Sequence, residues 1–225
     1  DEADASAGAS QAILVLGRLL EGASVSASGP EVGVSPARWR ESRWLALGEL
    51  ALVVALVAGV FYVIVPVTST PFLLVLGWIS LRMRGLGWRD VGFVRPRSWS
   101  RALVLGCLAG IVMELFSTFV TVPFLSHLAG TPPNLSEFRP TVGNLRLLLL
   151  WLVLNWTLVA FGEELAYRGY LLKRVAGLGQ GTRQAWLVSL VVASALFGWG
   201  HGGQGLTGML QEGFAGLLLG LLYLG

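Results

Sequence analysis

The sequence has little charge and a single cysteine. Aspartate, glutamate, lysine and arginine make up only 13% of its 225 residues, whereas hydrophobic residues make up 54%. Soluble domains usually carry about 25% charged residues, so this composition excludes an ordinary soluble domain and indicates an all-α, polytopic transmembrane helical bundle. Cys107 stands alone in an apolar run, which excludes an internal disulfide and a cysteine-rich zinc site.

About six apolar segments are predicted to cross the membrane, because about 20 helical residues cover a hydrocarbon core of about 30 Å. Their predicted ranges are 44–65, 67–81, 102–125, 145–175, 185–201 and 209 onward. Pro66 is expected to end the first segment, and the second is the shortest.

Residues 1–43 differ in composition from the rest of the chain. They are polar and rich in small residues, so we expect an extramembrane extension or linker ahead of a membrane domain at 44–225. The sequence begins at Asp1 without a methionine and stops at Gly225 inside an apolar run. We therefore expect a fragment trimmed at both ends, whose C-terminal part is missing.

Basic residues concentrate on one side of the predicted spans. When the spans alternate in direction, only Arg139 and Arg146 fall on the opposite side. The crowded side holds Arg38, Arg40, Arg43, the arginines between 82 and 101, Arg168, Lys173, Arg174 and Arg183. The positive-inside rule assigns that side to the cytoplasm. The net charge of +3 therefore reflects orientation, and no nucleic-acid partner is expected.

Two adjacent carboxylates and an arginine end the apolar run that begins at Leu145, in the stretch NWTLVAFGEELAYRGYLLKR. A charged side chain in hydrocarbon costs about 2.5 to 3.5 kcal/mol, so such a cluster indicates pairing or function. Glu164 and Arg168 are four residues apart and can form an ion pair on one helix face. Glu163 lies about 100° around an α-helix from Glu164 and has no local partner.

His201, in the stretch FGWGHGG, is the second candidate. A lone histidine at a helix end is more often a packed interior residue than a catalytic group, but the register favours function. Glu163 and His201 are equidistant from residue 182, which lies in the glycine-rich turn predicted at 177–183. In an antiparallel hairpin the two side chains are therefore level and can face each other.

A carboxylate and an imidazole are sufficient for general-base hydrolysis. Two other functions fit the same residues. An ion-coupled transporter would use Glu163, Glu114 and His201 as a relay, although no internal repeat is visible. A non-catalytic membrane scaffold or immunity protein would keep the fold without the chemistry. Two further glutamates are interpreted as structural. Glu49 is expected to reach interfacial water, and Glu212 is expected to contact a neighbouring helix.

The motif Glu163-Glu164-x-x-x-Arg168, followed by Phe197-x-x-x-His201, resembles the first two motifs of a family of intramembrane proteases. This is the CAAX protease and bacteriocin-processing family, also called Abi, which includes the CAAX prenyl endopeptidase. The connector GLGWRDVGFVRPRSW looks like the amphipathic segment of that family, so the resemblance covers roughly 44–225. It implies a helical fold of eight spans, from which this chain would be truncated.

The resemblance also implies roles for individual residues. Glu163 would activate the hydrolytic water or bind a metal, and His201 would orient the water or bind the same metal. Glu164 and Arg168 would hold the helix and its charge in place. The family leaves open whether Zn²⁺ is a cofactor or whether its members are glutamate-dependent hydrolases. A zinc site would require a further histidine, expected beyond Gly225.

The resemblance implies a membrane-associated peptide or protein substrate, either a prenylated CAAX-type peptide or a bacteriocin-like precursor. The protein would be an integral, multi-pass protein of a bacterial plasma membrane, in contact with membrane lipid. Its active site would open toward the basic, cytoplasmic side. The oligomeric state has no signal in the sequence.

Overall fold

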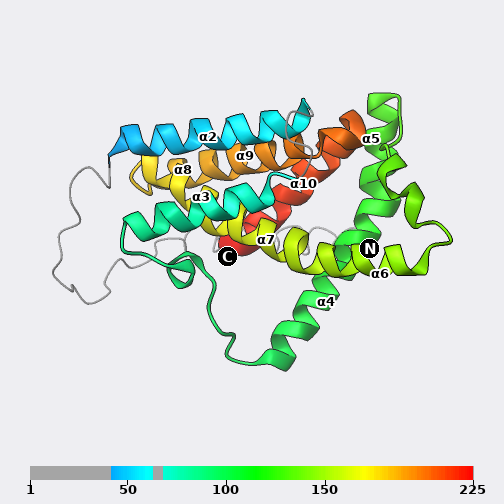
Figure 1. Cartoon of the computed structure of the whole chain (residues 1–225), viewed down its shortest axis with the longest axis horizontal. Helices are drawn as coiled ribbons and strands as arrows, with labels where there is room; N and C mark the ends of the chain where they lie inside the picture. Colours follow the sequence, from blue (N-terminus) through cyan, green and yellow to red (C-terminus); the bar gives the residue numbers. More distant parts are fainter. Residues whose placement is uncertain (1–41, 63–67, 225) are drawn as a thin grey trace, which may run out of the picture.

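The computed structural model describes residues 42–62 and 68–224, and these residues form helices and connecting turns with no β-strand (Figure 1). The predicted all-α class is therefore confirmed. Residues 1–41 and Pro66 lie outside the described residues, so the predicted extension at 1–43 and the predicted end of the first helix stay predictions.

The described residues form six continuous helical segments, called rods below, which follow the six predicted segments. Their helices are α2 (Arg43–Phe61), α3 (Thr70–Met83), α4 (Trp99–Phe116), α5 (Val122–Ala129), α6 (Leu145–Leu154), α7 (Phe161–Glu163), α8 (Lys173–Leu178), α9 (Arg183–Gly200) and α10 (Gly205–Leu224). Within two rods, π-helical segments join the α-helices, namely η3 (Ser117–Thr121), η5 (Asn155–Ala160) and η6 (Glu164–Leu172). Short 3₁₀ turns are η2 (Trp88–Val91), η4 (Ser136–Thr141) and η7 (Gly202–Gln204).

Within the described residues, four of the helical rods are long and apolar enough to cross a membrane. They are Arg43–Phe61, Trp99–Ala129, Leu145–Leu178 and Gly202–Leu224. Helix α3, with 14 residues, is shorter than a full span. Helix α9 falls outside this group because its first turn carries the polar residues Arg183 and Gln184. The chain is a helical integral membrane protein, as predicted.

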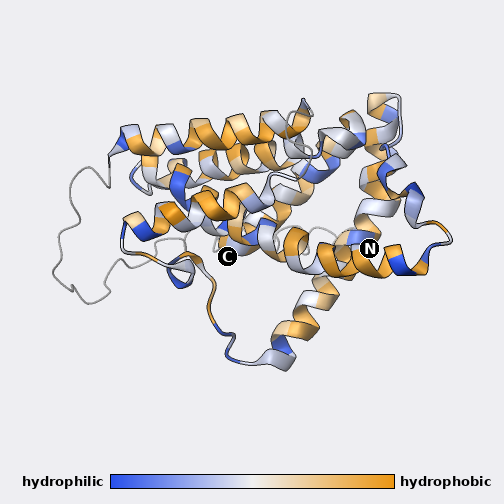
Figure 2. Cartoon of the chain, viewed as in Figure 1, coloured by the Kyte–Doolittle hydropathy of each residue, from blue (hydrophilic) through white to orange (hydrophobic). Residues whose placement is uncertain are grey.

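The buried core lies between α2, α3, η6, α8, α9 and α10, which pack side by side (Figure 1). Val57, Leu73, Leu172 and Phe197 are among its buried side chains. By contrast, α4 and α6 have no buried residue. Figure 2 shows that these helices are largely hydrophobic along their length, which suits contact with lipid.

A tight turn connects α8 to α9. Gln180 and Gly181 both have positive φ, of 59° and 66°, and reverse the chain between Leu178 and Arg183. The Thr182 hydroxyl then caps α9 by accepting a hydrogen bond from the backbone N–H of Ala185 at 3.2 Å. The turn predicted at 177–183 is therefore confirmed.

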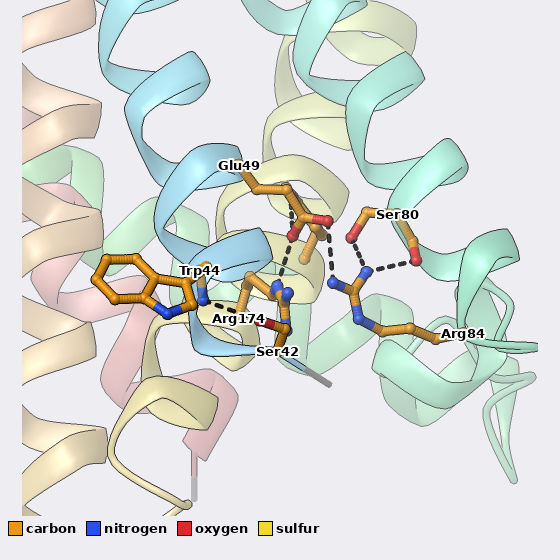
Figure 3. Close-up of polar contacts among 7 residues, drawn as sticks. Ser42, Trp44, Glu49, Ser80, Arg84 and Arg174 are labelled. Carbon is orange, nitrogen blue, oxygen red and sulfur yellow. Dashed lines mark hydrogen bonds and ion pairs between the residues drawn. The ribbon is translucent and has the colours of Figure 1, made fainter. Parts of the chain in front are cut away.

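A buried ion cluster joins α2, α3 and α8 at one end of the bundle (Figure 3). The Glu49 carboxylate accepts from Arg84 Nη2 at 2.9 Å, from Arg174 Nε at 2.5 Å and from the Tyr170 hydroxyl at 3.3 Å. Arg84 also donates to the backbone oxygen of Ser80 at 2.6 Å. The expectation that Glu49 reaches interfacial water is wrong, because these partners bury it.

Candidate active site

Glu163 ends α7, and its carboxylate meets the start of α3. The Thr70 hydroxyl donates a hydrogen bond to Glu163 Oε1 at 3.4 Å, and Thr70 is completely buried. Gly162 permits this approach, because a Cβ at that position would lie 3.0 Å from Thr70 Cγ2 and 3.2 Å from Leu74 Cδ1. The helix itself offers Glu163 no partner, but the neighbouring helix does.

The backbone changes its hydrogen-bonding pattern next to Glu163. After α7 the helix continues as η6, which has i→i+5 hydrogen bonds in place of the α-helical pattern. Residues after Glu163 therefore do not follow the 100° step expected of an α-helix. Such π-helical turns occur frequently at functional sites.

Glu164 and Arg168 form the predicted i,i+4 ion pair. Arg168 Nη1 lies 3.2 Å from Glu164 Oε1, with side-chain exposures of 4% for Arg168 and 45% for Glu164. The contact is an ion pair without good hydrogen-bond direction, since both Nη atoms of Arg168 lack a hydrogen-bond partner among the described residues. The guanidinium also lies 4.5 Å from the centre of the Phe197 ring. The contact of Arg168 with Phe197 links η6 to α9.

His201 follows α9 directly, and its ring is oriented by the preceding turn. Its Nδ1 lies 2.8 Å from the backbone oxygen of Phe197. Because a carbonyl only accepts, Nδ1 carries the proton, and in the neutral ring Nε2 is then the acceptor. The ring also packs on Phe197, with centroids 4.8 Å apart. His201 can therefore accept a hydrogen bond from water through Nε2.

The hairpin brings Glu163 and His201 to the same level. Tyr167 of η6 meets Phe197 of α9, and these two residues are equidistant from residue 182, as Glu163 and His201 are. A carboxylate and an imidazole at one level, on adjacent helices, can together bind and polarise a water molecule.

Two other residues join this group. Glu212 lies on α10, which contacts η6, and so supplies a second carboxylate to a helix that packs against this segment, in line with its expected role as a helix contact. Thr70 was missed altogether, because nothing in its local sequence links it to residue 163. Glu114 is exposed on α4, where its carboxylate accepts from Thr118 at 3.3 Å.

A metal site was also predicted at Glu163 and His201. Among residues 42–62 and 68–224, no three histidine, cysteine, aspartate or glutamate side chains are grouped so that they could hold a metal ion. Catalytic zinc usually takes three protein ligands. These residues therefore do not by themselves fit a zinc site, and Zn²⁺ as a cofactor stays a prediction that requires another ligand.

Comparison with known proteins supports the family resemblance. Residues 145–225 match the family model described as type II CAAX prenyl endopeptidase Rce1-like. No curated protein and no solved structure matches the chain. The matched region contains both glutamates, Arg168 and His201, so the resemblance seen in these motifs is confirmed. Residues 145–225 of this chain are therefore similar to the Rce1-like family.

Proposed function

We propose that this protein is an intramembrane endopeptidase that hydrolyses a peptide bond in a membrane-associated substrate. One observation carries the proposal: the Glu163 carboxylate, held by the Thr70 hydroxyl, lies at the level of His201 in the hairpin that the Tyr167–Phe197 contact aligns. The match of residues 145–225 to an endopeptidase family supports the same reaction class.

In the proposed mechanism, Glu163 acts as general base. It takes a proton from a water molecule whose oxygen forms a bond to the substrate carbonyl carbon. His201 orients this water by accepting a hydrogen bond at Nε2, while its Nδ1–H stays on the Phe197 carbonyl. The tetrahedral intermediate then collapses, the C–N bond breaks, and Glu163 delivers its proton to the leaving nitrogen.

Glu164 and Arg168 have a positioning role in this mechanism. Their ion pair orients the Arg168 side chain within η6, and the contact of Arg168 with Phe197 holds η6 against α9 beside Glu163 and His201. A bound Zn²⁺, if completed by a further ligand, would polarise the water and the carbonyl. The proton transfers assigned to Glu163 do not depend on it.

The match of residues 145–225 to an endopeptidase family model and the membrane setting support a substrate class. We propose a prenylated CAAX-type peptide or a bacteriocin-like precursor, cleaved in a site open to the basic, cytoplasmic side of a bacterial plasma membrane. The arginine distribution supports this orientation, because Arg84 and Arg174 converge at one end of the bundle.

The test is Glu163→Gln in the chain reconstituted in lipid, assayed with both peptide classes. Loss of a general base should lower kcat by about 10²- to 10⁴-fold with an unchanged fold. Glu114→Gln is the matched control, since it removes another carboxylate from an apolar helix and should retain activity. Cleavage by Glu163→Gln at the wild-type rate would overturn the proposal. Absence of cleavage by the wild-type protein would favour the scaffold alternative.

A further inference from the structure

A cavity lies at the end of α3, away from Glu163 and Glu164. It has a volume of about 280 Å³. Its lining residues are Trp78, Leu81, Arg82, Gly85, Leu86, Gly87 and Trp88. Thr70, which contacts Glu163, is twelve positions before Arg82 on the same helix, so about 18 Å separates the two sites. We call this the α3 cavity.

Arg82 supplies a cation to the α3 cavity. Its guanidinium carbon lies 5.9 Å from the centre of the Trp78 ring, and its side chain forms no salt bridge or hydrogen bond with the described residues. Arg84, two positions later, lies on nearly the opposite face of the helix and is paired with Glu49. The two arginines therefore differ in role, and Arg82 alone is available to a ligand.

The walls of the cavity are preformed. Trp88 packs against Gly77, where a Cβ would lie 3.1 Å from the indole. Gly87 donates its backbone N–H to Asp90 Oδ2 at 2.7 Å, which fixes the loop and occupies that carboxylate. Between residues 82 and 101 the sequence has six arginines and this one acid, so the surroundings are strongly basic.

An apolar strip leads away from the cavity along α3. Phe72, Val75 and Ile79 precede Arg82 at helical spacing and are all exposed, at 43%, 57% and 43%. A cation at the end of a lipid-facing apolar strip, flanked by tryptophans, has the composition of a membrane interface. A ligand with an anionic head and an acyl chain would match both parts.

We propose that the α3 cavity binds the headgroup of an anionic phospholipid. Arg82 pairs with the phosphate, Trp78 and Trp88 flank the glycerol region, and an acyl chain lies along Phe72, Val75 and Ile79. Basic pockets at the membrane surface are known to recognise anionic headgroups, and charge-assisted contacts of arginine to phosphate are strong. The source of the phosphate is membrane lipid, because a free anion would make no use of the apolar strip.

The test uses the chain purified in neutral detergent, with native mass spectrometry counting bound lipid. Phosphatidylglycerol should bind about tenfold more tightly than phosphatidylcholine. Arg82→Gln should weaken phosphatidylglycerol binding about tenfold, and Arg82→Lys should weaken it less. Arg89→Gln is the matched control, with the same charge change on an exposed residue outside the cavity, and should bind as wild type.

Three results would overturn the assignment. They are equal binding of the two lipids by the wild-type protein, equal losses in Arg82→Gln and Arg89→Gln, and full competition by inorganic phosphate at the same concentration as the lipid. The first and third need no variant, so they decide the question even if Arg82→Gln fails to fold.

Discussion

The ring of Tyr167 meets the ring of Phe197 edge-on, with centroids 5.1 Å apart and planes inclined by 81°. The same Phe197 ring receives the Arg168 guanidinium at 4.5 Å and the His201 imidazole at 4.8 Å. One buried phenyl group therefore sets the register of the hairpin and supports both the ion-paired arginine and the candidate catalytic histidine.

Phe197→Ala should destabilise the fold and separate these groups. Truncating a buried phenylalanine costs about 3 to 5 kcal/mol, through lost contacts and the cavity left behind. Phe119→Ala is the control, because Phe119 is 73% exposed on the lipid-facing surface and should change the free energy of unfolding by less than about 0.5 kcal/mol. Unfolding in mixed detergent measures the free energy of unfolding of both variants. Equal effects of the two variants would contradict the central role of Phe197.

Thr70→Val tests the hydrogen bond to Glu163. The substitution keeps the shape of the side chain and removes the hydroxyl, so the carboxylate loses its partner from α3. One such bond contributes about 1 kcal/mol, so kcat should fall about fivefold to tenfold while KM stays unchanged. Thr70→Ser should restore the rate. A change in KM alone, or no rescue by serine, would assign Thr70 to packing.

Local features of the site were predictable from the sequence. The hydrophobic runs gave the helices to within a few residues, and the glycines at 179 and 181 marked the turn before α9. The spacing of Glu164 and Arg168 indicated their ion pair, and the distances of Glu163 and His201 from that turn indicated their common level. Each of these depends on helical periodicity or on residues close in the chain.

Contacts between distant segments were not predictable. Thr70 and Glu163 are 93 positions apart, and Glu49 and Arg174 are 125 apart. No periodicity relates such residues, because their meeting depends on how whole helices pack. The π-helical segment after Glu163 was also unforeseen, since its residues have no composition that separates it from an α-helix. A single sequence therefore indicated the candidate catalytic pair but not the residues around it.

Glu49→Gln tests whether the buried ion cluster is structural. Arg84 and Arg174 are mostly buried, with side-chain exposures of 11% and 16%, and Glu49 is the only acid paired with them in the described part of the chain. Removing one member of a buried ion network costs about 3 to 5 kcal/mol, because the remaining charges lose compensation. The free energy of unfolding should fall by this amount, and activity per folded molecule should persist. Glu137→Gln, at an exposed glutamate of the 3₁₀ turn η4, should have no measurable effect.

Gly198→Ala tests the close crossing of α9 and α10. A Cβ at Gly198 would collide with the backbone oxygen of Met209 and lie 2.9 Å from Gly213 Cα, so the two helices would have to separate. Because small residues allow helices to approach closely in a membrane, the free energy of unfolding should fall by about 2 kcal/mol or more.

Gly110→Ala is the matched control, since a Cβ there meets nothing within 4 Å on exposed α4. Alanine favours a helix over glycine by up to about 1 kcal/mol, so this variant should be as stable as wild type or slightly more so. Unfolding in mixed detergent measures the change in the free energy of unfolding for each variant. Changes of opposite sign would follow only if α9 and α10 touch at Gly198. Two variants of equal stability would mean that the helices are farther apart, and the hairpin that aligns Glu163 with His201 would then lack support from α10.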